Sequence, residues 1–264
     1  MNSYRNVDNQ HRRYQAYVST LGTTQLHPRN PYVIAWWSAT FPGFGHFLLG
    51  KYLRGFALFL WEIVVNVNSQ INLGMVDAFC GHIEAAKHDL HPRWLIMYFP
   101  VFFFAIWDSY RTTVDLNNVA LLAQRENAPF NTFAIGSAEI NYLDKRNPVM
   151  SVLWSLMMPG LGQLHIHRVV MAFFLLIWTI VFFYESHVLQ ADQWLVLGQI
   201  SRATQVLNKE WLLFIPSILG FAIYDAYANT VENNKLYDSE QANYLRKHYQ
   251  QLRFTLIKGE RSEP

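Results

Sequence analysis

Pro42-Gly43-Phe44-Gly45 and Pro159-Gly160-Leu161-Gly162 are two copies of one Pro-Gly-x-Gly pattern, placed 117 positions apart in a chain of 264 residues. When the sequence is shifted against itself by this distance, further pairs of uncommon residues coincide without a gap. Chance similarity between apolar stretches would match Leu with Ile or Val, whereas here Trp and Pro coincide as well. The sequence therefore predicts an internal duplication. The coinciding stretches are Arg29-Asn30-Pro31 with Arg146-Asn147-Pro148, Trp37-Ser38 with Trp154-Ser155, and Asp108-Ser109-Tyr110 with Asp225-Ala226-Tyr227.

The composition is that of a membrane protein. Hydrophobic residues make up 52% of the chain and charged residues 15%, against roughly 25% charged residues in soluble domains. Six dense apolar blocks recur, at 32–49, 52–67, 94–107, 149–164, 169–184 and 211–224. Blocks this aromatic are too apolar for surface helices, although a large soluble helical core is the alternative. The single cysteine, Cys80, excludes an intramolecular disulfide. Because the first 29 residues lack the apolar core of a cleavable signal peptide, we expect the internal segments to drive insertion.

Each predicted repeat has the same order of segments. An apolar segment is broken at Pro-Gly-x-Gly, a short polar or basic stretch follows, and two apolar helices are then separated by a polar excursion. The second of these helices ends in Asp-x-Tyr and continues as a charged helix. We predict the N-terminal tail at 1–28, repeat 1 at 29–110, a helical linker at 111–145, repeat 2 at 146–227 and a helical basic tail at 228–264.

The distribution of positive charge predicts the orientation of these segments. If the tails, the linker and the turn after each Pro-Gly-x-Gly lie in the cytoplasm, only four of the 21 Lys and Arg residues lie outside, namely Lys87, Arg93, Arg202 and Lys209. This requires each broken segment to enter and leave on one face, as a re-entrant hairpin packed against protein. The prediction is an all-α, polytopic cell-membrane protein of two tandem parallel repeats, each a Pro-Gly-broken hairpin plus two spanning helices, with cytoplasmic termini. In the alternative the broken segments cross fully, which gives six spans instead of four and scatters the basic residues.

The first repeat resembles a known family through Pro42-Gly43-Phe44-Gly45-His46-Phe47-Leu48-Leu49-Gly50-Lys51, followed by Gly55 and later by Ile106-Trp107-Asp108. These residues resemble the signature of the TM-two (two-transmembrane) domain family. The second Pro-Gly-x-Gly, followed by Gln163, is similar to the Pro-Gly-x-Gly-Gln membrane proteins of bacteria. The chain departs from the family in its longer polar excursions and in His165-Ile166-His167, which replaces Leu-Leu-Gly. The resemblance implies a small membrane domain and adds no catalytic residues.

Asp108 and Asp225 are predicted to lie where the last helix of each repeat meets the cytoplasmic interface. They could bind a cation, or pair with a basic residue of the Pro-Gly turn such as Lys51 or Arg168. The alternative is an interfacial carboxylate that only ends the span and pairs locally. Because both repeats carry this Asp, we expect it to help build the unit, together with the other shared residues. These are Pro42, Gly43, Gly45, Pro159, Gly160, Gly162, Tyr110 and Tyr227.

Glu62 lies in the middle of the apolar block 52–67, and a carboxylate at that depth costs about 2.5–3.5 kcal/mol. Asn66 and Ser69 fall on the same face of a helix. With His46 from the hairpin, Glu62 and Asn66 could line a polar path, and His46 or Arg54 could pair with the carboxylate. The alternative is that the polar side chains only hold neighbouring helices together by hydrogen bonds.

One candidate metal site lies in the first polar excursion. Glu84, His88 and His91 would share one helical face at i, i+4 and i+7. A solvated helix with incidental histidines explains the same residues, and we predict no metal and no cofactor.

The sequence indicates a non-enzymatic membrane protein that organises or assists a partner. The expected partners are the lipid bilayer and either another membrane protein or a second copy of the chain. The alternative is a small transporter or channel component that uses the path near Glu62. An intramembrane enzyme would need a nucleophile and base, and no such pair is found. With a net charge of +2 and no recognisable module, nucleic-acid binding is not expected.

Overall fold

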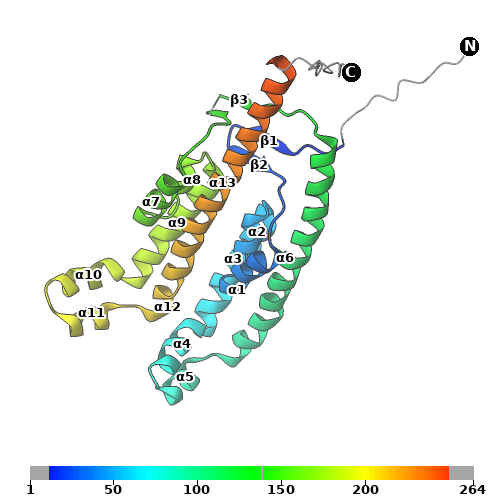
Figure 1. Cartoon of the computed structure of the whole chain (residues 1–264). Helices are drawn as coiled ribbons and strands as arrows, with labels where there is room; N and C mark the ends of the chain where they lie inside the picture. The colour runs from blue at the N-terminus through cyan, green and yellow to red at the C-terminus, as the bar shows by residue number, and fades with distance from the viewer. Residues whose placement is uncertain (1–11, 138, 250–264) are drawn as a thin grey trace, which may run out of the picture.

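The structure is a computed structural model that describes residues 12–137 and 139–249. The predicted N-terminal tail 1–28 and basic tail 228–264 are therefore described only in part. The described chain is mostly helical, with thirteen α-helices and four short β-strands. Figure 1 shows two groups of helices that lie side by side, with the strands at one end.

The helices of the first group are α1 (Pro31–Thr40), α2 (Phe44–Leu48), α3 (Tyr52–Ser69), α4 (Ile71–Phe79), α5 (Ile83–Asp89) and α6 (Pro92–Glu126). The second group contains α7 (Pro148–Met157), α8 (Leu161–His165), α9 (Val169–Ser186), α10 (Val188–Val196), α11 (Ile200–Val206), α12 (Lys209–Leu212) and α13 (Phe214–Tyr249). Helices α7 to α11 each begin and end 117 positions after α1 to α5. The predicted helix after each Asp-x-Tyr is present as the long continuation of α6 and of α13.

The glycines of Pro-Gly-x-Gly have two different physical roles. Gly43 and Gly160 adopt φ values of 104° and 107°, a conformation that side-chain-bearing residues rarely adopt. A Cβ atom on Gly45 would lie 2.2 Å from Ser38 Oγ, so the turn packs directly against α1. At Gly162 the same position would lie 2.0 Å from Ser155 Oγ on α7. The motif therefore makes a tight turn and lets α2 and α8 approach the preceding helices closely.

The described chain is mostly helical, as predicted, but it also contains two short β-hairpins that were not predicted. Strand β1 (Ala16–Ser19) pairs antiparallel with β2 (Gly22–Gln25), and β3 (Phe133–Ile135) pairs antiparallel with β4 (Ile140–Tyr142). Positive-φ Gly22 lies at the turn of the first hairpin. The two hairpins are joined by the Asn141 side chain, which donates to the backbone oxygen of Ser19 at 2.7 Å. The segment predicted as a helical linker is thus helical only to Glu126. Asn127, which adopts the left-handed conformation, caps the helix, and Pro129 follows.

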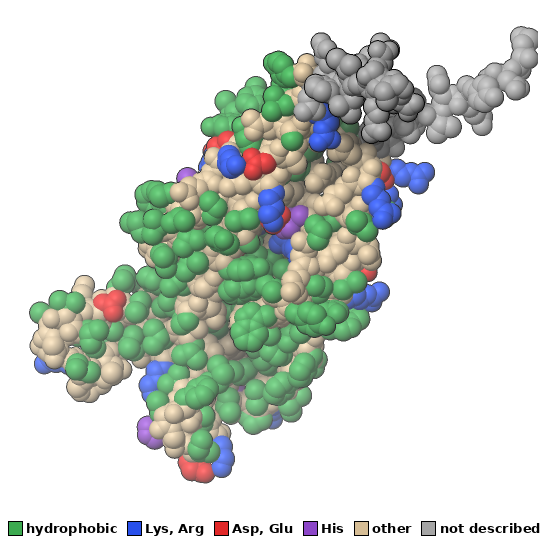
Figure 2. All heavy atoms as spheres, in the orientation of Figure 1, with side chains coloured by type: hydrophobic (Ala, Val, Ile, Leu, Met, Phe, Trp, Pro, Cys, Tyr) green, Lys and Arg blue, Asp and Glu red, His purple; other side chains and the backbone are tan. Residues whose placement is uncertain are grey.

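Within the described residues, two helices are long and apolar enough to cross a membrane: Val169–Ser186, and Lys209–Tyr249, which joins α12 and α13. A third is present if α5 and α6, which are bent by 87° at their junction, form one broken span. Helix α3 forms where a span is predicted, but Arg54, Glu62 and Asn66 make it less apolar. The chain is thus a membrane-associated helical protein, and four spans remain a prediction. Figure 2 shows hydrophobic side chains covering the middle of the molecule.

The two groups of helices pack together through aromatic rings. Phe44 of the first group stacks on Phe221 of the second, with ring centroids 4.1 Å apart. Phe59 meets Trp178 at 4.9 Å, edge to face. Phe44, Phe59 and Phe221 are all fully buried. Aromatic pairs in these geometries stabilise packing beyond simple burial, so this layer fixes how the two groups lie relative to each other.

Candidate functional site

Asp108 lies on α6 and faces the segment that follows the first Pro-Gly turn. Its Oδ2 is 3.0 Å from His46 Nε2 and accepts a hydrogen bond of 3.0 Å from Arg54 Nη1. The His46 side chain is fully buried, whereas that of Arg54 is 59% exposed. The basic partner is therefore Arg54 and not Lys51, because Lys51 caps α3 while Arg54 lies one turn further along, where α3 packs on α6.

Asp225 on α13 has a more enclosed set of partners. Arg168 forms an ion pair with Oδ1, and Arg168 is one of the two basic partners proposed from the sequence. Gln163 Nε2 donates to Oδ2 at 3.1 Å. Asn229 donates to Oδ1 at 2.9 Å. The carboxylate is completely buried. Gln163 stands 117 positions after His46, so both Asp residues bind the side chain that directly follows Pro-Gly-x-Gly.

The two tyrosines of Asp-x-Tyr lie differently. Tyr110 makes an edge contact with the ring of Tyr32 on α1, at 5.5 Å between centroids. Tyr227 is half exposed on α13. Only Tyr110 thus has an aromatic partner among the residues that the structure describes.

Glu62 belongs to a buried chain of polar side chains that links the two groups of helices. Asn66 Nδ2 donates to Glu62 Oε1 at 3.0 Å and to Asn72 Oδ1 at 3.3 Å. Asn72 in turn donates to the backbone oxygen of Glu210 at 3.0 Å. Glu62, Asn66 and Glu210 each keep one buried oxygen that receives no hydrogen bond from residues 12–137 or 139–249. His46 is not a member of this chain, since it binds Asp108.

The predicted helical face of Glu84, His88 and His91 does not form. Helix α5 ends at Asp89, and His91 is the N-cap of α6. Glu84 pairs with Lys87 at 2.9 Å, and His88 lies 3.3 Å from Asp89. Over residues 12–137 and 139–249, no group of three or more His, Cys, Asp or Glu side chains is placed to hold a metal ion.

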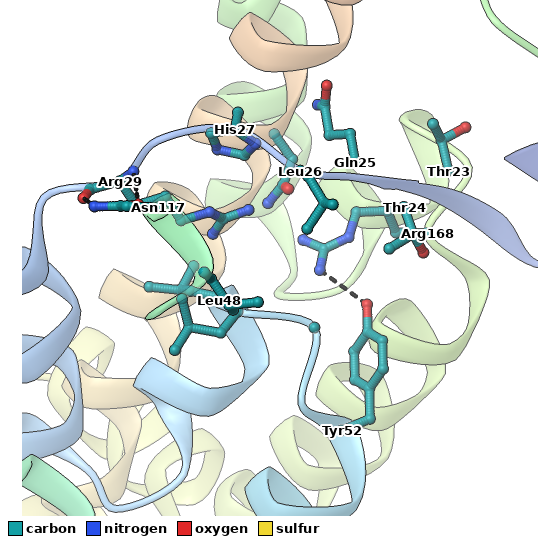
Figure 3. A pocket seen from close by; sticks show the side chains of 14 residues that line it. Thr23, Thr24, Gln25, Leu26, His27, Arg29, Leu48, Tyr52, Asn117 and Arg168 are labelled. Atoms are coloured by element: carbon teal, nitrogen blue, oxygen red, sulfur yellow. Dashed lines mark hydrogen bonds between the residues drawn. The ribbon is translucent and has the colours of Figure 1, made fainter. Parts of the chain in front are cut away.

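A small cleft, partly open to solvent, lies where the two groups of helices meet β2 and the segment after it. Figure 3 shows Arg29 and Arg168 extending into it from opposite sides. Arg168 Nη2 donates to the Tyr52 hydroxyl at 3.1 Å, which joins α9 to α3. The lining also includes His27, Asn117, Asn229 and polar side chains of β2, together with apolar side chains such as those of Leu48 and Leu116.

The Asn117 side chain holds the backbone of Arg29 at the edge of the cleft. The N–H of Arg29 donates to Asn117 Oδ1 at 2.9 Å, and its carbonyl oxygen accepts from Asn117 Nδ2 at 2.8 Å. Asn234 holds the backbone of Arg146 in the same way, at 2.9 and 2.7 Å. This pair of contacts fixes the chain where it enters α1 and α7.

The sequence reasoning did not identify this cleft. Tyr52, His27 and Asn117 stand outside the predicted site residues, and Arg29 was noted only as part of Arg-Asn-Pro. One signal was present: comparison at the 117-residue offset places His27 against Asp144 and Asn117 against Asn234. The second repeat thus has the acidic residue Asp144 two positions before its arginine, where the first repeat has His27.

Comparison with protein-family models, with curated proteins and with solved structures gives no match to this chain. The candidate site therefore rests on the geometry described above.

Proposed function

We propose that the chain is a multi-pass membrane protein, built by tandem duplication of one unit, that organises a membrane partner through its polar end and performs no chemistry. The recurrence of helix bounds at a fixed offset supports the duplication. The hairpins extend this correspondence, since β3 begins at Phe133, 117 positions after β1 begins at Ala16. We infer that the units run from 16 to 126 and from 133 to 243, wider than the predicted 29–110 and 146–227.

Two features carry the proposal. The space between the two groups of helices is filled, whereas the end of the molecule formed by the hairpins and the last turns of α13, called here the polar end, extends beyond it. Between the two groups of helices the space is filled with aromatic rings, as in Phe47 against Phe174 at 4.9 Å and Trp37 against Tyr224 at 5.2 Å. Helices α6 and α13 continue past this layer towards the two hairpins (Figure 1). The last turns of α13 carry mostly exposed side chains, including Tyr244, Leu245 and Tyr249. A surface of exposed aromatic, aliphatic and basic side chains suits a protein partner.

The buried chain from Glu62 to Glu210 supports a second candidate, a transporter or channel component. Carboxylates within membrane segments commonly mark ion or proton pathways. Parallel repeats related by an axis along the membrane normal are a known transporter plan. The aromatic layer argues against this candidate, because it lies between the two groups of helices where such a path would run.

Truncation after Glu240 tests the first candidate, because residues 241–249 are exposed except for half-buried Asn243. The full chain, cross-linked in its native membrane, should capture a defined partner that the truncated chain loses. The control is Glu62→Gln, which should keep the partner. Circular dichroism and thermal melting should show that both variants remain folded.

The same two variants decide between the candidates. In proteoliposomes, a transporter should give ion-coupled flux that Glu62→Gln abolishes and the truncation spares. Flux with this pattern, together with no loss of partner on truncation, would refute the organising role.

A further inference from the structure

The Arg29 and Arg146 sites have the same backbone geometry and different charges. At the second site, Arg146 Nε donates to both carboxylate oxygens of Asp144, at 2.9 and 3.0 Å. At the first site, His27 occupies the position 117 residues earlier. Among the described residues, no hydrogen bond or ion pair involves the guanidinium of Arg29. Among the described residues, Arg146 is thus paired with a carboxylate and its counterpart Arg29 is not.

The carboxylates that face Arg29 are already engaged. Asp225 binds Arg168 and Asn229, and Glu232 pairs with Lys235 at 2.7 Å. Burial, and then the neighbouring charge of Arg168, lower the pKa of Arg29 to about 10. The cleft therefore holds an excess of positive charge that no described side chain compensates.

Burial and the same positive charges also lower the pKa of His27. Burial, followed by Arg29, Lys235 and Arg168, lowers its pKa from 6.5 to about 3, so the imidazole is neutral at physiological pH. Its Nδ1 is buried and has no hydrogen-bond partner within the described part of the chain. A neutral imidazole can donate from one ring nitrogen, and it adds no negative charge beside Arg29.

We propose that this cleft binds a phosphate group between the guanidinium groups of Arg29 and Arg168. Guanidinium groups bind phosphate oxygens through paired, charge-assisted hydrogen bonds, and a partly enclosed site strengthens them. The Tyr52 hydroxyl and the His27 ring supply neutral donors beside the two guanidinium groups, of which Arg168 is already paired with Asp225. The phosphate belongs either to the headgroup of an anionic phospholipid or to a small soluble phosphate. This site does not depend on the proposed organising function.

His27→Asp gives the sharpest test, because it copies into the first site the carboxylate that the second site already has. The new carboxylate should pair with Arg29 and lower phosphate affinity about tenfold or more. Arg29→Gln should give a similar loss by removing the charge. Arg146→Gln is the matched control and should leave binding unchanged, since Arg146 is already paired with Asp144.

Two ligands distinguish the source of the phosphate. The full chain in detergent is titrated with inorganic phosphate by calorimetry, and with phosphatidylglycerol or phosphatidylcholine by native mass spectrometry. Preferential binding of phosphatidylglycerol assigns the site to a lipid headgroup, and binding of inorganic phosphate alone assigns it to a soluble ligand. In either case the loss must occur in His27→Asp and Arg29→Gln.

The proposal is overturned if the wild-type chain binds neither ligand, if His27→Asp binds as tightly as wild type, or if Arg146→Gln weakens binding equally. Thermal melting establishes that each variant is folded. If His27→Asp does not purify as a folded protein, the comparison of Arg29→Gln with Arg146→Gln decides the outcome.

Discussion

The carboxylate of Asp225 and the guanidinium of Arg168 form an ion pair in which the two side chains are only 0% and 8% exposed. The corresponding pair in the first group joins Asp108, 13% exposed, to Arg54, 59% exposed. Removing one partner of a buried pair leaves an uncompensated charge, whereas an exposed arginine is solvated again. We therefore expect the ion pair of Asp225 to stabilise the fold more than the ion pair of Asp108.

Asp225→Asn should lower the free energy of unfolding by about 3–5 kcal/mol. Asp108→Asn should lower it by about 1 kcal/mol, because water can solvate Arg54. Unfolding in mixed micelles, followed by tryptophan fluorescence, measures both values. Equal losses in the two variants would show that burial of the pair does not decide its contribution.

Gly45→Ala and Gly162→Ala should both destabilise the fold, by about 1–3 kcal/mol, because the added methyl group meets backbone and serine atoms that cannot easily move. Gly220→Ala is the matched control. A Cβ atom there would meet only Trp37 at 3.8 Å, an ordinary contact, and alanine favours the helix by about 1 kcal/mol. Thermal melts of the three variants should rank Gly220→Ala above wild type and the other two below it. Tolerance of alanine at Gly45 would remove the close-approach explanation of the motif.

Local patterns in the sequence were sufficient to predict most of the helices. Proline at the start and Pro-Gly-x-Gly at the break act through backbone geometry. Helices α1 and α7 begin at these prolines and end before the break, and α2 and α8 begin directly after it. The hairpins were missed because β1 and β3 are only four and three residues long, and are stabilised by contact with each other. Such tertiary pairing leaves no local periodicity to detect.

The candidate site was predictable only in part, for the same reason. Asp108 and Asp225 could be found because they recur, and the choice of Arg168 as partner followed from proximity to the turn. Choosing Arg54 over Lys51, or bringing Asn72 and Glu210 to Glu62, requires knowing how separate helices pack. The cleft combines side chains from both groups of helices and from the segment after β2, and no stretch of sequence contains more than a few of them.

The depressed pKa of His27 predicts a specific dependence of stability on pH. Its pKa is about 3 in the folded state and near 6.5 when exposed. Between these values the unfolded chain binds a proton that the folded chain does not, so folding should lose stability as the pH falls from about 6.5 towards 3. Above 6.5 this histidine should contribute no pH dependence.

His27→Gln isolates this effect, because glutamine does not titrate and the carboxylates common to both proteins cancel in the comparison. In phosphate-free buffer, the difference in melting temperature between the two proteins should be constant above pH 7. As the pH falls to 4, the melting temperature of the wild type should fall relative to that of the variant. Parallel curves over the whole range would show that the pKa of His27 is the same in the folded and the unfolded chain.

Cys80 offers a direct test of the proposed orientation. It is the single cysteine of the chain, it is exposed, and it lies between α4 and α5, at the opposite end from the last turns of α13 (Figure 1). If the α4–α5 region lies outside and α13 ends in the cytoplasm, an impermeant maleimide should label Cys80 in intact cells. Cysteine at Gln241, in a Cys80→Ser background, should react only after the membrane is permeabilised.

The two labels together separate the arrangements considered from the sequence. With re-entrant hairpins, both polar excursions lie on the Cys80 side, so cysteine introduced at exposed Ile200 on α11 should also react from outside. If the broken segments cross fully and the N-terminus is cytoplasmic, each unit has three spans and the second unit is inverted. Cysteine at Ile200 should then still react from outside, whereas Cys80 should react only after the membrane is permeabilised. Reaction at Gln241 in intact cells would contradict the cytoplasmic terminus in both arrangements, since the last turns of α13 continue directly from its apolar part.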